Sequence, residues 1–271
     1  MTDTLSPHHV RNKAPRWLVV IYALGVIPLL VMAGVMLAGI GGAAGNGLNE
    51  VVSLAIAGGA VAALSVQVSA LSGLLAHRHW AREVALLAQL FWVLGAFGFL
   101  VSGITGGGVG FFATAVVFLA MGFVTARTLW RGWDLGPAPV YAEAIHPHGW
   151  VTWESALGAA LVLPFVGFVV WVLNHVRSLA PSVSLSTWVT IGILVTLMTL
   201  PWFLVHAFAA HGLDHRHDYG LVVAIIGGVL WFFTVIGIPI GLAQLYSVWK
   251  VSHPVLALPS RLAPTRGGAQ A

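Results

Sequence analysis

Residues 84–126, VALLAQLFWVLGAFGFLVSGITGGGVGFFATAVVFLAMGFVTA, decide the fold because this run contains no charged residue. A membrane-spanning helix needs about 20 consecutive apolar residues, so the run has room for two spans. The cluster Gly106-Gly107-Gly108-Val109-Gly110 in its middle favours a turn. The stretch therefore predicts a hairpin of two helices that cross a membrane.

The composition of the whole chain agrees with a membrane protein. Of 271 residues, 59% are hydrophobic and 7% are charged, whereas about a quarter of the residues of a soluble domain are charged. The net charge of +4 is spread thinly, as in loops beside a membrane, which argues against a nucleic-acid partner. Without cysteine, the chain has no disulfide and no thiolate metal site. We expect an all-α, polytopic transmembrane helix bundle in a lipid bilayer.

On either side of the central run, four further stretches without a charged residue in their interior predict spans over about residues 17–40, 50–76, 154–173 and 187–208; two of them begin at a charge, Glu50 and Glu154. The last stretch, residues 219–249, is ambiguous. It is too long for one comfortable span and short for two.

Basic residues decide between seven and eight crossings. If residues 219–249 form one helix, the three basic residues that follow it join Arg177 on the outer face, which places 4 of the 12 basic residues there. If the chain turns between Ile236 and Pro239, Arg177 alone lies outside. Cytoplasmic loops carry the excess of Lys and Arg. We therefore expect about eight crossings, with both termini on the cytoplasmic side of a bacterial cytoplasmic (inner) membrane.

Two motifs recur about half a chain apart. The tripeptide His77-Arg78-His79 returns as His215-Arg216-His217, and a Trp followed eleven residues later by Pro occurs at Trp17 and again at Trp153. Recurrence of Trp, His and Arg at membrane interfaces by composition alone is the alternative explanation. Because order and spacing agree along the whole half, we interpret the pattern as a duplication.

Each half then holds four crossings and enters and leaves on the same side, so the sequence predicts two parallel four-helix repeats about an axis along the membrane normal. The expected organisation is a cytoplasmic N-terminal tail (1–16), a first repeat (17–135), a cytoplasmic linker (136–152), a second repeat (153–250) and a cytoplasmic C-terminal tail (251–271).

Two short motifs carry a resemblance to a known group of proteins. The chain has His79-Trp80-Ala81-Arg82 before an apolar helix, and Pro239-Ile240-Gly241 before Tyr246 and Trp249. In these features it resembles small four-span bacterial membrane proteins of unassigned function, which have an R-x-W-A-R turn and a helix with F-P-x-G and Y-x-x-W. The second half departs from the pattern, with Asp218-Tyr219-Gly220 in place of Trp-Ala-Arg. The resemblance implies a membrane helix hairpin and no activity.

Histidine is the conspicuous chemical feature, with 12 in the chain. The densest group holds His206, His211, Asp214, His215 and His217, and imidazole with carboxylate suits a divalent metal such as Zn²⁺. Histidines from elsewhere in the chain could complete such a site, namely His77, His79, His146 and His148. Anchoring of helix ends at the membrane interface is the alternative role, and no metal or other cofactor is required by any motif.

Polar residues within the expected spans are few. Gln67, His206 and Gln244 are the residues that a substrate path between the repeats would use, although hydrogen bonds between packed helices are an equally ordinary role. No phosphate loop, nucleophile elbow or metalloprotease motif occurs. We expect a protein that is not an enzyme.

Three functions remain open from the sequence. The first is a structural or accessory component of a membrane assembly, with other membrane-protein subunits as partners. The second is a transporter or small-molecule permease with its cleft between the repeats. The third is a membrane protein that binds a divalent metal at the cytoplasmic histidines.

Overall fold

A computed structural model describes residues 15–42, 47–76, 78, 80–131, 149–179, 184–215, 217–233 and 237–256. These residues form helices and short connections, with no strand in the described part of the chain. The elements are α1 (Arg16–Gly42), α2 (Gly47–Leu75), α3 (Ala81–Ser102), the π-helical segment η1 (Gly103–Gly107), α4 (Val109–Arg131), α5 (Gly149–Ala160), α6 (Val162–Leu179), α7 (Leu185–Asp214), α8 (Asp218–Leu230), the 3₁₀ segment η3 (Trp231–Phe233) and α9 (Gly237–Leu256).

Six helical segments in the described residues are long and apolar enough to cross a membrane, which confirms the expected class of fold. They are α1, α2, α3, α4, α7 and the combined α5 and α6. Residues Asp218–Phe233 form a shorter apolar helix.

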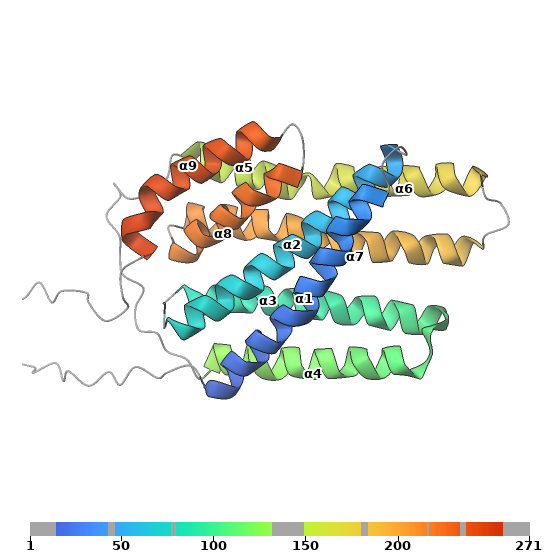
Figure 1. The fold of residues 1–271 in the computed structure, drawn as a ribbon, viewed down its shortest axis with the longest axis horizontal. Coiled ribbons are helices and arrows are strands. Elements are labelled where there is room, and N and C mark those ends of the chain that lie inside the picture. The colour runs from blue at the N-terminus through green and yellow to red at the C-terminus, as the bar shows by residue number, and fades with distance from the viewer. Residues whose placement is uncertain are drawn as a thin grey trace, which may run out of the picture.

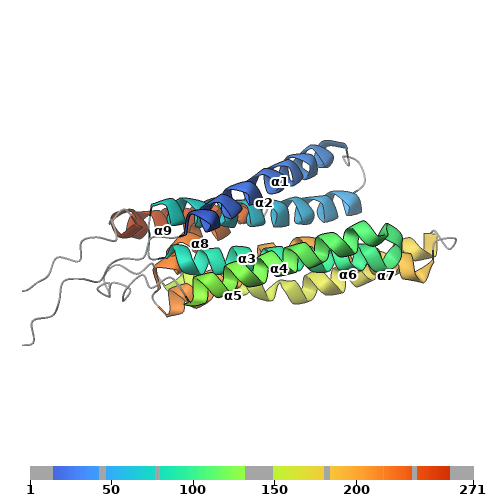
Figure 2. The same cartoon turned by 90° about the horizontal axis from the view of Figure 1, so that it is seen from below.

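The helices run roughly along the long axis of the molecule, and α1 crosses the others obliquely (Figure 1). The short α8 and α9 form a hairpin confined to one end of the bundle, the end at which α1 begins and α9 finishes (Figure 1). Seen from a perpendicular direction, α1 and α2 lie on one side of the bundle and α4 on the other (Figure 2). The first half is defined here as α1 to α4 and the second half as α5 to α9.

The expected turn between the two central spans is present. The α-helix α3 ends at Ser102, the π-helical segment continues to Gly107, and Gly108 then adopts a φ of 79°. A positive φ of this size costs little only for glycine, so Gly108 allows the chain to reverse before α4.

The fifth span is interrupted where α5 gives way to α6 at Leu161. Pro164 explains the break, because proline has no N–H to donate to the carbonyl of Ala160 and its ring crowds that carbonyl. Helix α5 begins at Gly149, four residues before the start expected for the second repeat. Pro28, by contrast, lies inside a continuous α1.

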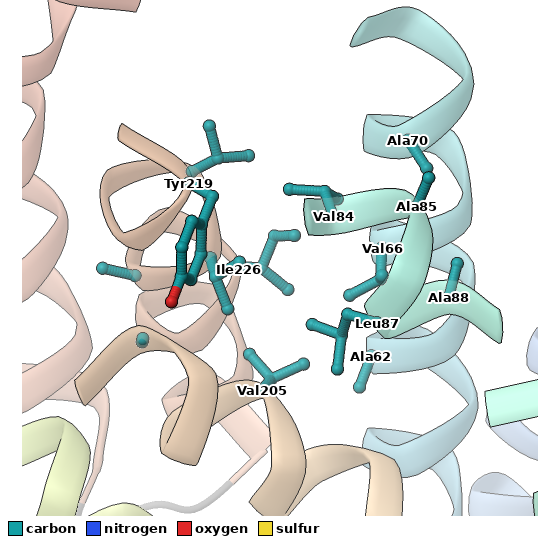
Figure 3. Close-up of a cluster of buried hydrophobic side chains, with 14 of the residues drawn as sticks. Ala62, Val66, Ala70, Val84, Ala85, Leu87, Ala88, Val205, Tyr219 and Ile226 are labelled. Atoms are coloured by element: carbon teal, nitrogen blue, oxygen red, sulfur yellow. The ribbon is translucent and has the colours of Figure 1, made fainter. Parts of the chain in front are cut away.

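The core lies where α2 and α3 meet α7 and α8. Figure 3 shows Val66 of α2 and Leu87 of α3 facing Val205 of α7 and Ile226 of α8. Alanine and valine supply much of this cluster, and small side chains allow helices in a membrane to approach closely. Within each half, helices that are consecutive in the sequence pack on one another, with α5 and α6 both on α7.

The two halves approach each other closely at Gly59 of α2. A Cβ atom placed on Gly59 would overlap the backbone carbonyl of Met198 in α7. The neighbouring Gly58 has more room, since its Cβ would lie 3.4 Å from the Trp202 ring. Glycine at position 59 is therefore required by backbone contact between α2 and α7.

The turn between α2 and α3 and the turn between α7 and α8 have the same hydrogen bonds. In the first turn, the N–H of Ala76 donates to the Ser72 carbonyl, that of Arg78 to Gly73 and that of Ala81 to Arg78. In the second turn, the N–H of His215 donates to the His211 carbonyl, that of His217 to Gly212 and that of Gly220 to His217. Each donor and acceptor residue of the second turn follows the corresponding residue of the first turn by 139 positions. The His-Arg-His tripeptides predict an offset of 138, so the turns correspond one residue further along. Three residues of these tripeptides, His77, His79 and Arg216, lie outside the described residues.

Candidate functional site

A cavity of about 350 Å³ lies between the first half and α7. Its walls come from α1, α2, α3 and α4 on one side and from α7 on the other, and include Pro28, Ala63, Phe91, Phe118 and Met198. No charged side chain is among the described residues that line it. Its volume falls in the range of about 300–1,000 Å³ that is usual for small-molecule sites.

The cavity is elongated along α3. Its lining on that helix extends from Ala88 to Ser102, which corresponds to about 21 Å at 1.5 Å per residue. Half of a bilayer hydrocarbon core is about 15 Å thick. The site thus has the length and the polarity of a slot for an apolar chain.

Gln67 and Trp92 form the polar end of the cavity. The Trp92 indole N–H donates to Gln67 Oε1 at 3.1 Å, and Gln67 Nε2 donates to the Tyr22 carbonyl at 3.0 Å. The Tyr22 hydroxyl donates to the Ala85 carbonyl at 2.7 Å and accepts from Gln89 Nε2 at 2.8 Å. This network ties α1, α2 and α3 together, and its polar atoms are used for helix packing.

The second half holds a different polar cluster around the fully buried His206. Its ring packs against the rings of Trp202 and Trp231, with centroids 4.6 and 5.3 Å away, and the two indole rings also contact each other at 5.5 Å. His206 Nδ1 lies 2.9 Å from the Trp202 carbonyl. A carbonyl can only accept, so Nδ1 carries the hydrogen and Nε2 presents a lone pair.

Several polar atoms near His206 are buried without a hydrogen-bond partner in the described residues. They are His206 Nε2, Gln244 Oε1 and Ser155 Oγ. Gln244 Nε2 donates to the Ala224 carbonyl at 3.1 Å. Because a Cβ on Gly227 would lie 3.5 Å from both His206 Nε2 and Gln244 Nε2, the two side chains come together at Gly227.

The three residues considered for a substrate path are thus divided between two places. His206 and Gln244 meet in the second half, whereas Gln67 lines the cavity in the first. All three side chains are buried. Hydrogen bonding between packed helices, the alternative role for these residues, accounts for the bonds of Gln67. His206 Nε2 and Gln244 Oε1 have no hydrogen-bond partner among the described residues.

The other histidines considered for metal binding form an exposed row at the junction of α7 and α8. The rings of His211 and His215 are 4.3 Å apart, those of His215 and His217 are 6.2 Å apart, and His217 stacks on Tyr219 at 5.5 Å. His215 Nδ1 faces the His211 carbonyl at 3.0 Å and lies 3.7 Å from Asp214 Oδ2.

This row differs from a metal site in two respects. His206 is buried among tryptophans and is apart from the exposed imidazoles. No group of three or more His, Asp or Glu side chains in the described residues is placed to hold a metal ion. His77, His79, His146 and His148 lie outside the part of the chain that the structure describes.

Sequence reasoning missed Trp92, which lines the cavity beside Gln67, and Tyr22, which belongs to the hydrogen-bond network behind them. The available signal was the scarcity of polar side chains in the spans, which singled out Gln67 but not the Trp92 indole that donates to it or the Tyr22 phenol that donates to the Ala85 carbonyl. Aromatic residues read as apolar in a span, although each of these carries a hydrogen-bonding group.

No family model, curated protein or solved structure matches this chain. The resemblance to small four-span membrane proteins therefore stays a prediction.

Proposed function

We propose that this chain is a membrane protein, without catalytic activity, that binds an apolar molecule of the bilayer in the cavity between α7 and the first half. The observation that carries the proposal is the cavity itself, which is apolar along its length and has Gln67 and Trp92 at one end. A charged or strongly polar substrate would find no countercharge among the described lining residues. The same site gives the chain a role beyond structural support of an assembly.

We also propose that the two halves arose by duplication and are related by a two-fold axis along the membrane normal. Gly59 contacts Met198, which follows it by the same 139 residues that relate the two turns. A residue touches its own counterpart only near a two-fold axis. Contacts between the halves are also reciprocal, since α3 packs on α7 while α2 packs on α8.

The outer helices add similar correspondences. Gly25 of α1 lies against Trp92 and Gln67, and Gly158 of α5 lies against His206, which follows Gln67 by 139 residues. Gly122 of α4 faces Gln89, and Gly241 of α9 touches Gly228, the residue 139 positions after Gln89. Gly158 follows Gly25 by 133 residues and Gly241 follows Gly122 by 119, so α5 corresponds to α1 and α9 to α4 by place in the fold and not by the 139-residue register of the inner helices.

In the proposed topology both termini lie on the cytoplasmic side, six segments cross the membrane, and α8 and α9 form a short hairpin that enters and leaves at the cytoplasmic end in place of the last two of the eight crossings expected from the sequence. The described ends of the chain support it, because α1 begins and α9 finishes at the same end of the bundle (Figure 1). Four basic residues lie near the helix termini at that end of the bundle, at the starts of α1 and α3 and toward the ends of α4 and α9: Arg16, Arg82, Arg127 and Lys250. The positive-inside rule makes this end cytoplasmic, in a bacterial inner membrane.

Mass spectrometry of the purified protein, released intact from detergent, tests the binding function. We expect wild-type protein to retain one apolar, membrane-derived molecule per chain. Gly95→Leu and Gly98→Leu place side chains on the cavity wall, where a Cβ finds open space at Gly95 and only Leu194 at 3.9 Å from Gly98. Both variants should fold and should lose the bound molecule.

Gly167→Leu is the matched control. It adds the same side chain in α6, where a Cβ also meets open space, but Gly167 does not line the cavity. Its bound molecule should remain. Equal retention by all three variants would refute binding in this cavity.

A further inference from the structure

A second, separate groove lies on the other side of the α3–α4 hairpin. It is open, has a volume of about 380 Å³, and is lined by Leu86 of α3 and by Phe123, Ala126, Arg127 and Trp130 of α4. None of these five residues lines the cavity between the halves. Leu86, Phe123 and Ala126 form an apolar floor, and the rim carries the Arg127 guanidinium and the Trp130 indole.

A second guanidinium stands at the same rim. The Arg82 guanidinium carbon lies 5.8 Å from the centroid of the Trp130 ring, in a cation–π contact. Arg82 Nε is buried and has no hydrogen-bond partner in the described residues. Its position on Trp130 holds it beside the groove, with donors left over for a ligand.

Carboxylates do not neutralise this pair within the described part of the chain. No ion pair joins Arg82 or Arg127 to a described Asp or Glu. The groove therefore combines two cations with an apolar floor.

The position of the groove indicates which ligand it fits. Arg82 begins α3 and Trp130 ends α4, at the same end of the bundle (Figure 1). Trp and Arg at the end of apolar spans lie at the level of lipid headgroups. From that level the groove continues along Leu86 and Phe123, and Phe123 is 68% exposed on the outside of the bundle.

We propose that this groove binds an anionic phospholipid, with its phosphate on Arg82 and Arg127 and an acyl chain over Leu86, Phe123 and Ala126. Guanidinium groups form paired, charge-assisted hydrogen bonds to phosphate oxygens. Basic pockets between helices at the cytoplasmic side suit such headgroups. The site does not depend on the cavity function, because it uses other residues.

The test measures lipid retention by the full-length protein with native mass spectrometry, after titration with phosphatidylglycerol, with phosphatidylcholine or with inorganic phosphate. We expect preferential retention of one phosphatidylglycerol. Arg127→Gln, at an exposed position that folding does not need, should lower that occupancy about five- to tenfold. Lys250→Gln, which removes an exposed cation from α9 at the same end, is the matched control and should have no effect.

A second variant tests the acyl-chain part of the groove without changing charge. Ala126→Phe fills the floor and should lower phosphatidylglycerol retention while both guanidiniums remain. Equal retention of phosphatidylcholine, equal losses in Arg127→Gln and Lys250→Gln, or displacement of the lipid by inorganic phosphate would each overturn the proposal. The first two outcomes would indicate adsorption to a general surface, and the third a site for a free anion.

Discussion

Gly59 of α2 lies directly on the backbone of Met198 of α7, so that a Cβ atom at position 59 would overlap the Met198 carbonyl. This contact brings the two halves of the chain together at their centre. It also borders the proposed binding cavity, because both residues line it. A change at Gly59 therefore acts on the junction of the halves and on the site at the same time.

Gly59→Ala should destabilise the protein by about 1–3 kcal/mol, because the methyl group must push two helix backbones apart. Gly58→Ala is the control. Its Cβ would make an ordinary contact with Trp202 at 3.4 Å, and its stability should stay within about 0.5 kcal/mol of wild type. Unfolding in mixed detergent micelles measures both, and equal effects of the two variants would contradict the packing described for α2 and α7.

Gln67 and His206 occupy corresponding places in the proposed duplication but should respond differently to substitution. Gln67→Leu removes the acceptor for the Trp92 N–H and the donor to Tyr22, and should cost about 1–2 kcal/mol. His206→Phe removes one hydrogen bond, from Nδ1 to the Trp202 carbonyl, and a second ring nitrogen, Nε2, that has no described partner, so it should cost less. A larger loss of stability in His206→Phe than in Gln67→Leu would show that Nε2 has a partner of its own.

The exposed imidazoles should not hold a metal tightly. The rings of His211, His215 and His217 follow one another in a row, and no group of three or more His, Asp or Glu side chains in the described residues is placed to hold a metal ion. We expect no metal to remain after dialysis against a chelator, and His211→Ala combined with His215→Ala to leave thermal stability unchanged. Metal retained in a one-to-one ratio and lost in the double variant would restore the metal site, and its affinity would then fall as the pH falls, since protonated imidazole cannot bind metal.

The topology can be tested with reporters. A reporter that is active only in the cytoplasm should be active when it is fused after Ala271, and one that is active only outside should be active when it is inserted after Gly108. The first result follows from the turn between α8 and α9, and the second from the turn between α3 and α4. An inactive cytoplasmic reporter at the C-terminus would favour seven crossings.

The spans were predictable from the sequence because charge is so costly in a bilayer that charge-free runs mark helices. Residues 84–126 show this well, since the Gly cluster turned the chain at Gly108 as expected. The break before Pro164 also follows from a local rule. Each of these features depends on one segment of chain and its immediate neighbours.

The packing register was not predictable in the same way. The tripeptides around Arg78 and Arg216 suggested a correspondence that the hydrogen bonds of the turns shift by one residue. Trp, His and Arg gather at membrane interfaces whatever the register, whereas the contact of Gly59 with Met198 depends on it. A cleft between the repeats with Gln67 in its path was among the possibilities left open by the sequence, but the apolar lining was not predictable, since apolar residues that line a cavity read like those that face lipid.

Electron cryo-microscopy of the wild-type protein in lipid nanodiscs tests the central claim most directly. We predict an elongated density that belongs to no side chain, in the cavity beside α3, extending from Gln67 and Trp92 toward Ser102. The same density should be absent from Gly98→Leu and present in Gly167→Leu. A wild-type map in which side chains close the space between α3 and α7, with no such density, would contradict the proposed binding function.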